Sequence, residues 1–281
     1  MRTIAITNTK GGSGKTTTTV NLAAAAVARG KRALLIELDP QGTASKIQLG
    51  TEHANMPIEH TAAAIFGDQV PPMEQVVMTT KHGIDLIPAT PALNKARHEI
   101  AERGLHLLRI RSMLTKGRAA ERYDYVFIDT QGAMGEFLNV GLFSADEVLI
   151  TSDPTNESLI CVGNTMAMIE QVNESRLEMN LSPLAVLGLF LNKTEHHRKG
   201  TREALDDAMQ ADKAGYIRLL ATTAPLRTIQ QEAVRMNTPV VLHAPASDLA
   251  KSFLALYDEL FVAPIIETSD REPKLAVVTH G

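Results

Sequence analysis

The chain is poor in cysteine and in aromatic residues. Its 281 residues include one cysteine, Cys161, which excludes an intrachain disulfide framework and is typical of a cytosolic protein. There is no tryptophan, and aromatic residues make up only 4% of the chain, so the core has to be built from aliphatic side chains and methionine. Cys161 lies in a predicted helix, where we expect a buried structural residue rather than a redox-active or metal-binding thiol.

The chain also lacks a long apolar run and a strong net charge. The longest apolar run near the N-terminus, residues 22–28, is too short to span a bilayer, and no segment before the first strand resembles a signal peptide. We therefore expect a cytoplasmic protein with no membrane partner. The formal net charge is −4, so any affinity for nucleic acid would have to come from a local basic patch.

Short apolar runs alternate with helical segments along the whole chain. This alternation predicts an α/β fold with a doubly wound, mostly parallel sheet flanked by helices. Strands are expected at residues 3–8, 33–36, 84–88, 125–129, 148–151, 184–191 and 239–242, and helices at 14–29, 93–116, 157–173 and 247–261. Residues 46–80 are expected to form one or two helices and a loop over the sheet edge. We expect a single domain over residues 1–263 and a loosely ordered tail over 264–281.

The most informative segment is a glycine-rich loop between the first strand and the first helix. It consists of Lys10, Gly11, Gly12, Ser13, Gly14, Lys15, Thr16 and Thr17. A strand, a glycine loop and a helix form the context that a phosphate-binding loop requires, because backbone N–H groups and the helix N-terminus then face the anion. In such a loop Lys15 would reach the β- and γ-phosphates and the Thr16 hydroxyl would bind Mg²⁺. The alternative is an ordinary surface turn rich in glycine.

A second candidate site residue ends a later strand. The apolar run 125–129 finishes in Asp129, as in the Walker B pattern, where the aspartate holds Mg²⁺ through water. Ligands of open α/β sheets gather at the carboxyl ends of the strands, so Asp129 is expected beside the glycine loop.

The loop departs from the common pattern G-x-x-x-x-G-K-[ST], because Thr9 stands where the first glycine would be and a second lysine, Lys10, follows it. This variant resembles the deviant Walker A ATPases of the ParA/MinD family, over residues 3–261. The resemblance implies a P-loop fold, ATP and Mg²⁺ as cofactors, and slow, partner-stimulated ATP hydrolysis. It also implies an ATP-dependent homodimer in which Lys10 contacts the ATP of the partner subunit.

The resemblance also suggests two switch segments. Residues 37–45 match the family's switch I, so Asp39 is expected to help orient the attacking water; a turn at Asp39 without function is the alternative. Glu37 and Thr43 replace the family's usual aspartate and asparagine. After Asp129 the family usually has two prolines, whereas this chain has residues 130–132, Thr-Gln-Gly, so the detail of switch II cannot be carried over. A glycine here could still act as a hinge.

Two further segments match family positions near the adenine. Asn192 ends a strand where the family often has an asparagine beside the base, although a simple strand-end turn would also favour this residue. Pro225 belongs to a segment that resembles the family's region between the adenine and the DNA-facing surface. Two adjacent histidines, His196 and His197, do not suggest zinc, because neighbours on a helix point apart and no cysteine or carboxylate cluster accompanies them.

The known functions within the family differ in features that a sequence can carry. One cysteine cannot supply the shared cluster of a nitrogenase-type iron protein. The C-terminal segment is interrupted by Pro273, unlike the basic amphipathic membrane helix of MinD, and it has no tyrosine. No helix-turn-helix precedes the first strand. The resemblance is therefore strongest to ParA-type partition ATPases, whose partners are nonspecific double-stranded DNA and a ParB-like centromere-binding protein.

For a ParA-like protein, a nucleoid-associated state is expected when ATP is bound. Nonspecific DNA binding needs only phosphate contacts, so scattered basic residues suffice, although each could equally be ordinary surface charge. The candidate DNA-binding residues are Lys193, Arg198, Lys199, Arg202, Arg218, Arg227 and Arg235. The alternative function is a MinD-like or cargo-positioning ATPase that acts on a protein complex or membrane site rather than on DNA.

Overall fold

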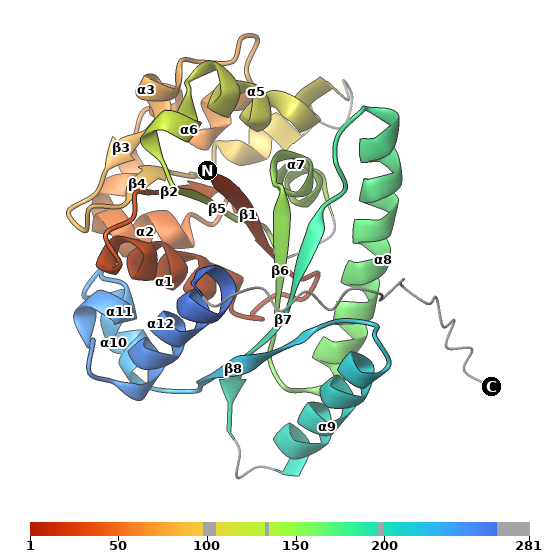
Figure 1. The fold of residues 1–281 in the computed structure, drawn as a ribbon. Helices are drawn as coiled ribbons and strands as arrows, with labels where there is room; N and C mark the ends of the chain where they lie inside the picture. The colour runs from red at the N-terminus through yellow and green to blue at the C-terminus, as the bar shows by residue number, and fades with distance from the viewer. Residues whose placement is uncertain (98–104, 133–134, 196–198, 263–281) are drawn as a thin grey trace.

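The computed structural model describes residues 1–97, 105–132, 135–195 and 199–262. One eight-stranded sheet has the order β3-β4-β2-β5-β1-β6-β7-β8 (Figure 1). The strands are β1 (Arg2–Thr7), β2 (Ala33–Glu37), β3 (Met78–Thr79), β4 (Asp85–Ile87), β5 (Tyr125–Asp129), β6 (Glu147–Ser152), β7 (Ala185–Thr194) and β8 (Leu219–Pro225). Neighbouring strands pair in parallel except β3 and β4, which pair antiparallel at one edge. The predicted doubly wound, mostly parallel fold is confirmed.

Helices cover both faces of this sheet (Figure 1). They are α1 (Lys15–Ala28), α2 (Thr43–Leu49), α3 (Met73–Val76), α5 (Arg109–Lys116), α6 (Ala119–Arg122), α7 (Glu136–Ser144), α8 (Asn156–Glu178), α9 (Lys199–Lys213), α10 (Ile229–Arg235), α11 (Val240–His243) and α12 (Asp248–Phe261). Short 3-10 helices lie at Gly50–Asn55, Ile58–His60, Ala62–Phe66 and Leu105–Leu108. Helices α1, α11 and α12 pack on one face, and α5, α7 and α8 pack on the other.

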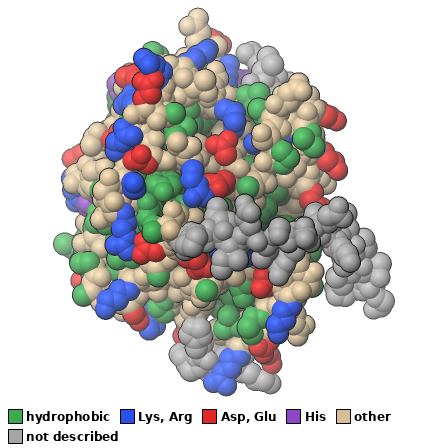
Figure 2. Space-filling view, in the orientation of Figure 1, with side chains coloured by type: hydrophobic (Ala, Val, Ile, Leu, Met, Phe, Trp, Pro, Cys, Tyr) green, Lys and Arg blue, Asp and Glu red, His purple; other side chains and the backbone are tan. Residues whose placement is uncertain are grey.

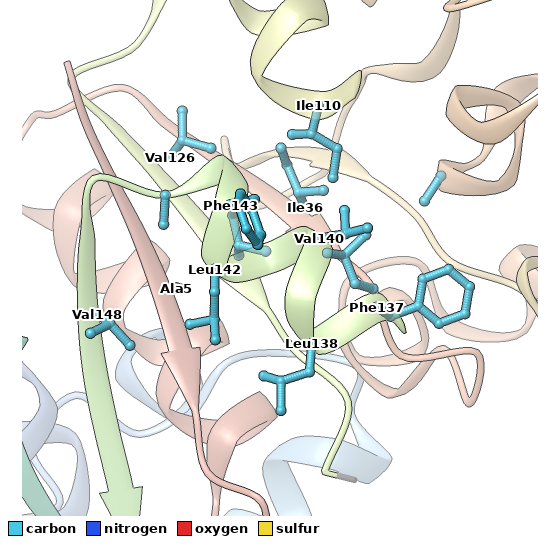
Figure 3. Packing of buried hydrophobic residues seen from close by; sticks show 14 of the residues in the cluster. Ala5, Ile36, Ile110, Val126, Phe137, Leu138, Val140, Leu142, Phe143 and Val148 are labelled. Carbon is cyan, nitrogen blue, oxygen red and sulfur yellow. The ribbon is translucent and has the colours of Figure 1, made fainter. Parts of the chain in front are cut away.

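Two hydrophobic cores result from the alternation of side chains along the central strands. Ala5 and Val126 point to the face covered by α7 (Figure 3), whereas their neighbours Ile4 and Phe127 point to the face covered by α1 and α12. Because both faces are buried, each central strand has a continuous apolar run in its middle, such as residues 4–6 of β1, which is the pattern from which it was predicted. At the carboxyl ends of β1, β2 and β5 the apolar runs give way to the polar residues Thr7, Glu37 and Asp129.

A buried arginine links two helices, α7 and α8, on one face of the sheet. Arg176 of α8 is fully buried and its guanidinium donates hydrogen bonds to the backbone carbonyls of Leu142, Phe143, Ala145 and Ser182. Three of these carbonyls lie at the C-terminal end of α7, where a positive charge also complements the helix dipole. Burial lowers the pKa of Arg176, but these oxygens satisfy the buried charge. Arg176 thus ties α7 to α8.

One predicted strand is wrong. Residues 239–242 form the beginning of α11, and the edge strand of the sheet is β8, which the sequence did not predict. Pro239 has φ −58° at the N-cap of α11, a backbone angle that suits the start of a helix. A four-residue apolar run cannot be assigned to helix or strand by its periodicity, and β8 is only partly buried with two polar threonines, so its apolar pattern is weak.

Other expectations are corrected in detail. Residues 46–80, expected to form one or two helices and a loop, contain the end of α2, three short 3-10 helices, α3 and the antiparallel strand β3. Of the long helix expected over 93–116, residues 93–97 are helical, residues 98–104 lie outside the described residues, and a 3-10 helix at Leu105–Leu108 leads into α5. Cys161 is partly exposed rather than buried. The expected tail, 264–281, also lies outside the described part of the chain.

Candidate functional site

The glycine loop lies between β1 and α1 and lines a cavity of about 240 Å³. Gly12 and Gly14 have φ of 76° and 92°, in the left-handed region that favours glycine. These turns leave backbone N–H groups and the N-terminus of α1 beside the cavity, which is the arrangement that binds phosphate. The cavity is lined by Gly11, Gly12, Gly14, Lys15, Thr16, Thr17, Asp39, Gly132 and Lys193.

Lys15 is the buried cation of this loop. The residue is 6% exposed, and its Nζ donates hydrogen bonds to the backbone oxygens of Asn8 (3.0 Å) and Lys10 (2.8 Å). Burial lowers the pKa of Lys15, while the charges of Asp129 and Asp39 act in the opposite direction. A buried ammonium that is bound to neutral carbonyls gains strongly from an anion, because charge-assisted hydrogen bonds are the stronger ones.

Asp129 ends β5 and places its carboxylate at the same edge of the sheet. Its Oδ1 accepts a hydrogen bond from Thr19 (3.3 Å), and its buried Oδ2 has no partner among the described residues. Burial raises the pKa of Asp129 to about 7, although the adjacent Thr16 hydroxyl lowers it. A carboxylate and a hydroxyl beside a phosphate-binding loop are oxygen donors of the kind that Mg²⁺ prefers, so these residues fit the ion that the sequence implied.

Glu37 and Asp39 lie close together in sequence, but Glu37 binds the start of α2 whereas Asp39 lines the cavity. Glu37 is fully buried, and its carboxylate accepts hydrogen bonds from the backbone N–H groups of Ala44 (2.7 Å) and Ser45 (2.9 Å) and from the Ser45 hydroxyl. Burial and the neighbouring Asp129 raise the pKa of Glu37 to about 8. Glu37 therefore holds the N-terminus of α2, a role that sequence spacing did not reveal. Asp39 lines the cavity, and its carboxylate accepts the N–H of Gln41 (2.9 Å).

The segment after β5 closes over the loop. The Thr130 hydroxyl donates to the backbone oxygen of Ile6 (2.7 Å), and the Gln131 side chain accepts a hydrogen bond from Arg97 (2.9 Å). A Cβ on Gly132 would lie 2.8 Å from Lys15 Nζ. The glycine is thus required by close approach to the phosphate-binding loop. The sequence indicated a possible hinge at Gly132 but not this contact, and it gave no signal for Arg97.

Lys10 is bound to its own chain in this structure. Its Nζ donates to Ser158 Oγ (2.7 Å) and Thr155 Oγ1 (3.3 Å) and lies 3.5 Å from the Asp153 carboxylate. These three residues belong to the loop after β6 and the start of α8. The side chain keeps 26% of its surface exposed, so the ammonium lies at the rim of the site rather than in the cavity.

Asn192 and Pro225, the two residues expected near the base, lie near the carboxyl end of β7 and at the end of β8. Asn192 is 4% exposed and packs directly on the loop, because a Cβ on Gly14 would lie only 2.1 Å from Asn192 Nδ2. Pro225 pairs with Thr194 in the sheet register. Asn192 therefore contacts the phosphate-binding loop itself, while Pro225 lies on the neighbouring edge strand.

The expected DNA-binding residues whose side-chain contacts are described lie at separate places. Arg227 forms an ion pair with Asp248 (2.6 Å), and Arg218 lies 3.7 Å from Glu259. Arg198 lies outside the described residues, and the Lys193 side chain points to the glycine loop. The positions of the other candidates are known by element: Lys199 and Arg202 belong to α9, and Arg235 ends α10. On the face shown in Figure 2, Lys and Arg are interspersed with Asp and Glu.

Within the described residues, no group of three or more His, Cys, Asp or Glu side chains is arranged to hold a metal ion. The pair His196 and His197 falls outside those residues. In the same part of the chain, each helix is too short or too polar to cross a membrane.

Known proteins with similar sequences cover almost the whole chain. A family model described as an AAA domain matches residues 1–182. The sporulation initiation inhibitor protein Soj of Bacillus subtilis is 30% identical over 257 residues, which cover 92% of this chain and 97% of that protein. The chromosome partitioning protein ParA of Caulobacter vibrioides is 28% identical over 279 residues, which cover 98% of each.

Solved structures share the fold at lower sequence identity. An ATP complex of a McdA variant from Cyanothece matches with a TM-score of 0.76 and 20% identity, over 95% of this chain and 99% of that one. MinD with Mg-ADP from Pyrococcus horikoshii matches with a TM-score of 0.68 and 23% identity, over 92% and 96%. The family model, the identity to Soj and the two-lysine loop at the end of β1 lead to one conclusion: the chain belongs to the ParA/MinD family of P-loop ATPases.

Proposed function

We propose that the protein is a ParA-type ATPase that binds Mg²⁺ and ATP, dimerises around ATP and binds DNA without sequence preference. Hydrolysis, stimulated by a ParB-like partner, then releases the dimer and moves or positions plasmid or chromosomal DNA. The observation that carries this proposal is the pair of lysines in one loop, Lys15 buried in the cavity and Lys10 at its rim. The similarity to Soj and to a chromosome partitioning protein supports it.

Each residue in and beside the cavity has a separate role in the proposed ATP hydrolysis. Lys15 and the loop amides would neutralise the phosphates. Thr16 and Asp129 would hold Mg²⁺, which would supply further charge stabilisation at the transferred phosphoryl group. Asp39, which lines the cavity from the β2–α2 loop, orients the attacking water. Catalysis of this kind consists of positioning and electrostatic stabilisation, so displacement of any one group by about 1 Å is costly.

Lys10 couples hydrolysis to dimerisation. In the single chain its ammonium is held by Asp153, Thr155 and Ser158, and it must leave them to reach a partner subunit's nucleotide. These contacts are partly exposed and therefore weak enough to be exchanged for a phosphate. The single chain is thus expected to bind ATP but to hydrolyse it slowly.

DNA binding in this proposal is electrostatic. Arg227 forms an exposed ion pair with Asp248, and such a pair contributes at most about 1 kcal/mol, so a DNA phosphate can replace the carboxylate. Arg218 is itself exposed, 3.7 Å from Glu259. Arg235 at the end of α10 and the basic residues of α9 are further candidates for separate phosphate contacts. Since these contacts carry no sequence information, the affinity depends on salt rather than on DNA sequence.

A gel shift on random duplex DNA tests the proposal. Binding is expected only with MgATP, and it should weaken steeply between about 50 and 200 mM salt. Binding to lipid vesicles without DNA binding would instead favour a MinD-like or cargo-positioning ATPase. Binding to DNA that is equally strong without nucleotide would contradict the ATP-dependent cycle.

Two variants test the assigned roles. Lys10→Ala is expected to bind MgATP but to lose the dimer, hydrolysis and DNA binding, with Lys251→Ala on the exposed face of α12 as the control. Normal hydrolysis by Lys10→Ala would exclude the sandwich dimer. Asp39→Ala is expected to form a DNA-bound dimer that does not hydrolyse ATP. If Asp39→Ala loses DNA binding instead, Asp39 does not orient the water.

A further inference from the structure

Lys193 was expected on the DNA-facing surface, but its side chain points to the glycine loop. Lys193 has φ of 57°, in the left-handed region that non-glycine residues rarely occupy. The register between β7 and β8 shifts between Leu191 and Thr194. Lys193 therefore lies at an irregular point of β7. The Lys193 Nζ donates a hydrogen bond to the backbone oxygen of Gly12 (2.5 Å).

The preceding residue supports this placement. Asn192 Oδ1 accepts the N–H of Lys193 (2.8 Å), and Asn192 packs on Gly14. Its Nδ2 is buried and has no partner among the described residues. Two consecutive residues of β7 thus contact two glycines of the loop. The left-handed backbone conformation of Lys193 costs free energy, and the contacts of Asn192 with the loop hold it in place.

Lys193 lines the same cavity as Lys15. Its ammonium is bound to a neutral carbonyl oxygen, and an anion in the cavity would be a better acceptor. By contrast, Arg218 and Arg227 are bound to carboxylates away from the cavity. Because Lys15 and Lys193 line one cavity, the two ammonium groups fit a ligand that carries several negative charges, such as a chain of phosphates.

We propose that Lys193 is a phosphate-binding residue of the nucleotide site, which moves from the Gly12 carbonyl to the phosphate chain of a nucleoside di- or triphosphate. This inference rests on the proposed ATPase function and extends it. It assigns Lys193 to nucleotide affinity rather than to DNA affinity. Three lysines, Lys10, Lys15 and Lys193, then contact nucleotide phosphates in the dimer, and two of them act within the single chain.

Substitutions at Lys193 separate its charge from its hydrogen bond. Lys193→Gln removes the charge and keeps a polar N–H group on a side chain that is one atom shorter. Lys193→Arg keeps the charge, and Lys251→Gln removes an exposed lysine on α12 as a matched control. Affinities for MgADP and MgATP are measured by calorimetry without DNA. We expect Lys193→Gln to bind both about 5- to 20-fold more weakly, while Lys193→Arg and Lys251→Gln remain near wild type.

A gel shift then tests whether Lys193 contacts DNA instead. With MgATP at saturation for each protein, Lys193→Gln is expected to bind random duplex DNA as well as the wild type does. Unchanged nucleotide affinity in Lys193→Gln would overturn the inference, and so would a loss of DNA binding at saturation with nucleotide affinity intact. If the wild type binds neither MgATP nor MgADP, the proposed ATPase function itself fails. Thermal melting confirms that the variants are folded.

Discussion

Gly132 offers a sharp test of how closely switch II approaches the phosphate-binding loop. In Gly132→Ala the new Cβ would lie 2.8 Å from Lys15 Nζ, 3.1 Å from Gly11 Cα and 3.3 Å from the Lys10 backbone oxygen. The Lys15 head can move away, but Gly11 and Lys10 are backbone contacts, so the loop itself has to shift. Overpacking of this kind costs about 1–3 kcal/mol.

That cost falls on the geometry that binds phosphate. The loop amides and Lys15 must stay in position, so we expect Gly132→Ala to bind MgADP roughly 5- to 150-fold more weakly, the equivalent of about 1–3 kcal/mol. The measurement is isothermal titration calorimetry with MgADP, together with thermal melting to show that the fold is retained. ATP hydrolysis should fall at least as much, because Lys15 also acts on the transferred phosphate.

The control lies three residues further on. A Cβ on Gly135 would meet no atom of the described residues within 4 Å, so Gly135→Ala changes the same segment without a clash there. Its affinity for MgADP is expected to stay within about twofold of the wild type, as for most substitutions in open space. The reasoning is refuted if Gly132→Ala binds MgADP as well as Gly135→Ala does.

Three further predictions concern stability. Arg176→Met leaves four backbone carbonyls without their donor and should reduce the free energy of unfolding in urea by about 3–5 kcal/mol; a loss below about 1 kcal/mol would contradict its anchoring role. Glu37→Asp shortens the side chain that holds the N-terminus of α2 and should cost about 1–3 kcal/mol, although the family usually has aspartate there; an unchanged melting temperature would count against the hydrogen bonds seen. Burial lowers the pKa of His82, so the unfolded chain takes up a proton first and stability should fall as the pH drops through about 6.5. His82→Gln should flatten this dependence in urea titrations at several pH values, and an equally steep fall in the variant would exclude His82 as the source.

Much of the site was predictable because it depends on local spacing. A glycine loop after a strand places Lys15 and Thr16 at a helix N-terminus, and the apolar run before Asp129 places that carboxylate at a strand end. In a parallel sheet the carboxyl ends of β1 and β5 lie at the same edge, so these groups had to meet. The strands buried on both faces were recognisable for the same reason, as continuous apolar runs.

The tertiary structure decided what depends on contacts between distant segments. The sequence alone could not show that Lys193 reaches Gly12 or that Gly132 lies against Lys15, because these pairs are joined only by the packing of β7 and β5 around the loop. It could not separate α11 from a strand either, since a run of four apolar residues fits both. The sequence by itself determined the family, the fold and the phosphate-binding loop, whose residues are neighbours in the chain. The tertiary structure determined which distant side chains complete that loop, because direction and distance between separate strands are properties of the folded sheet.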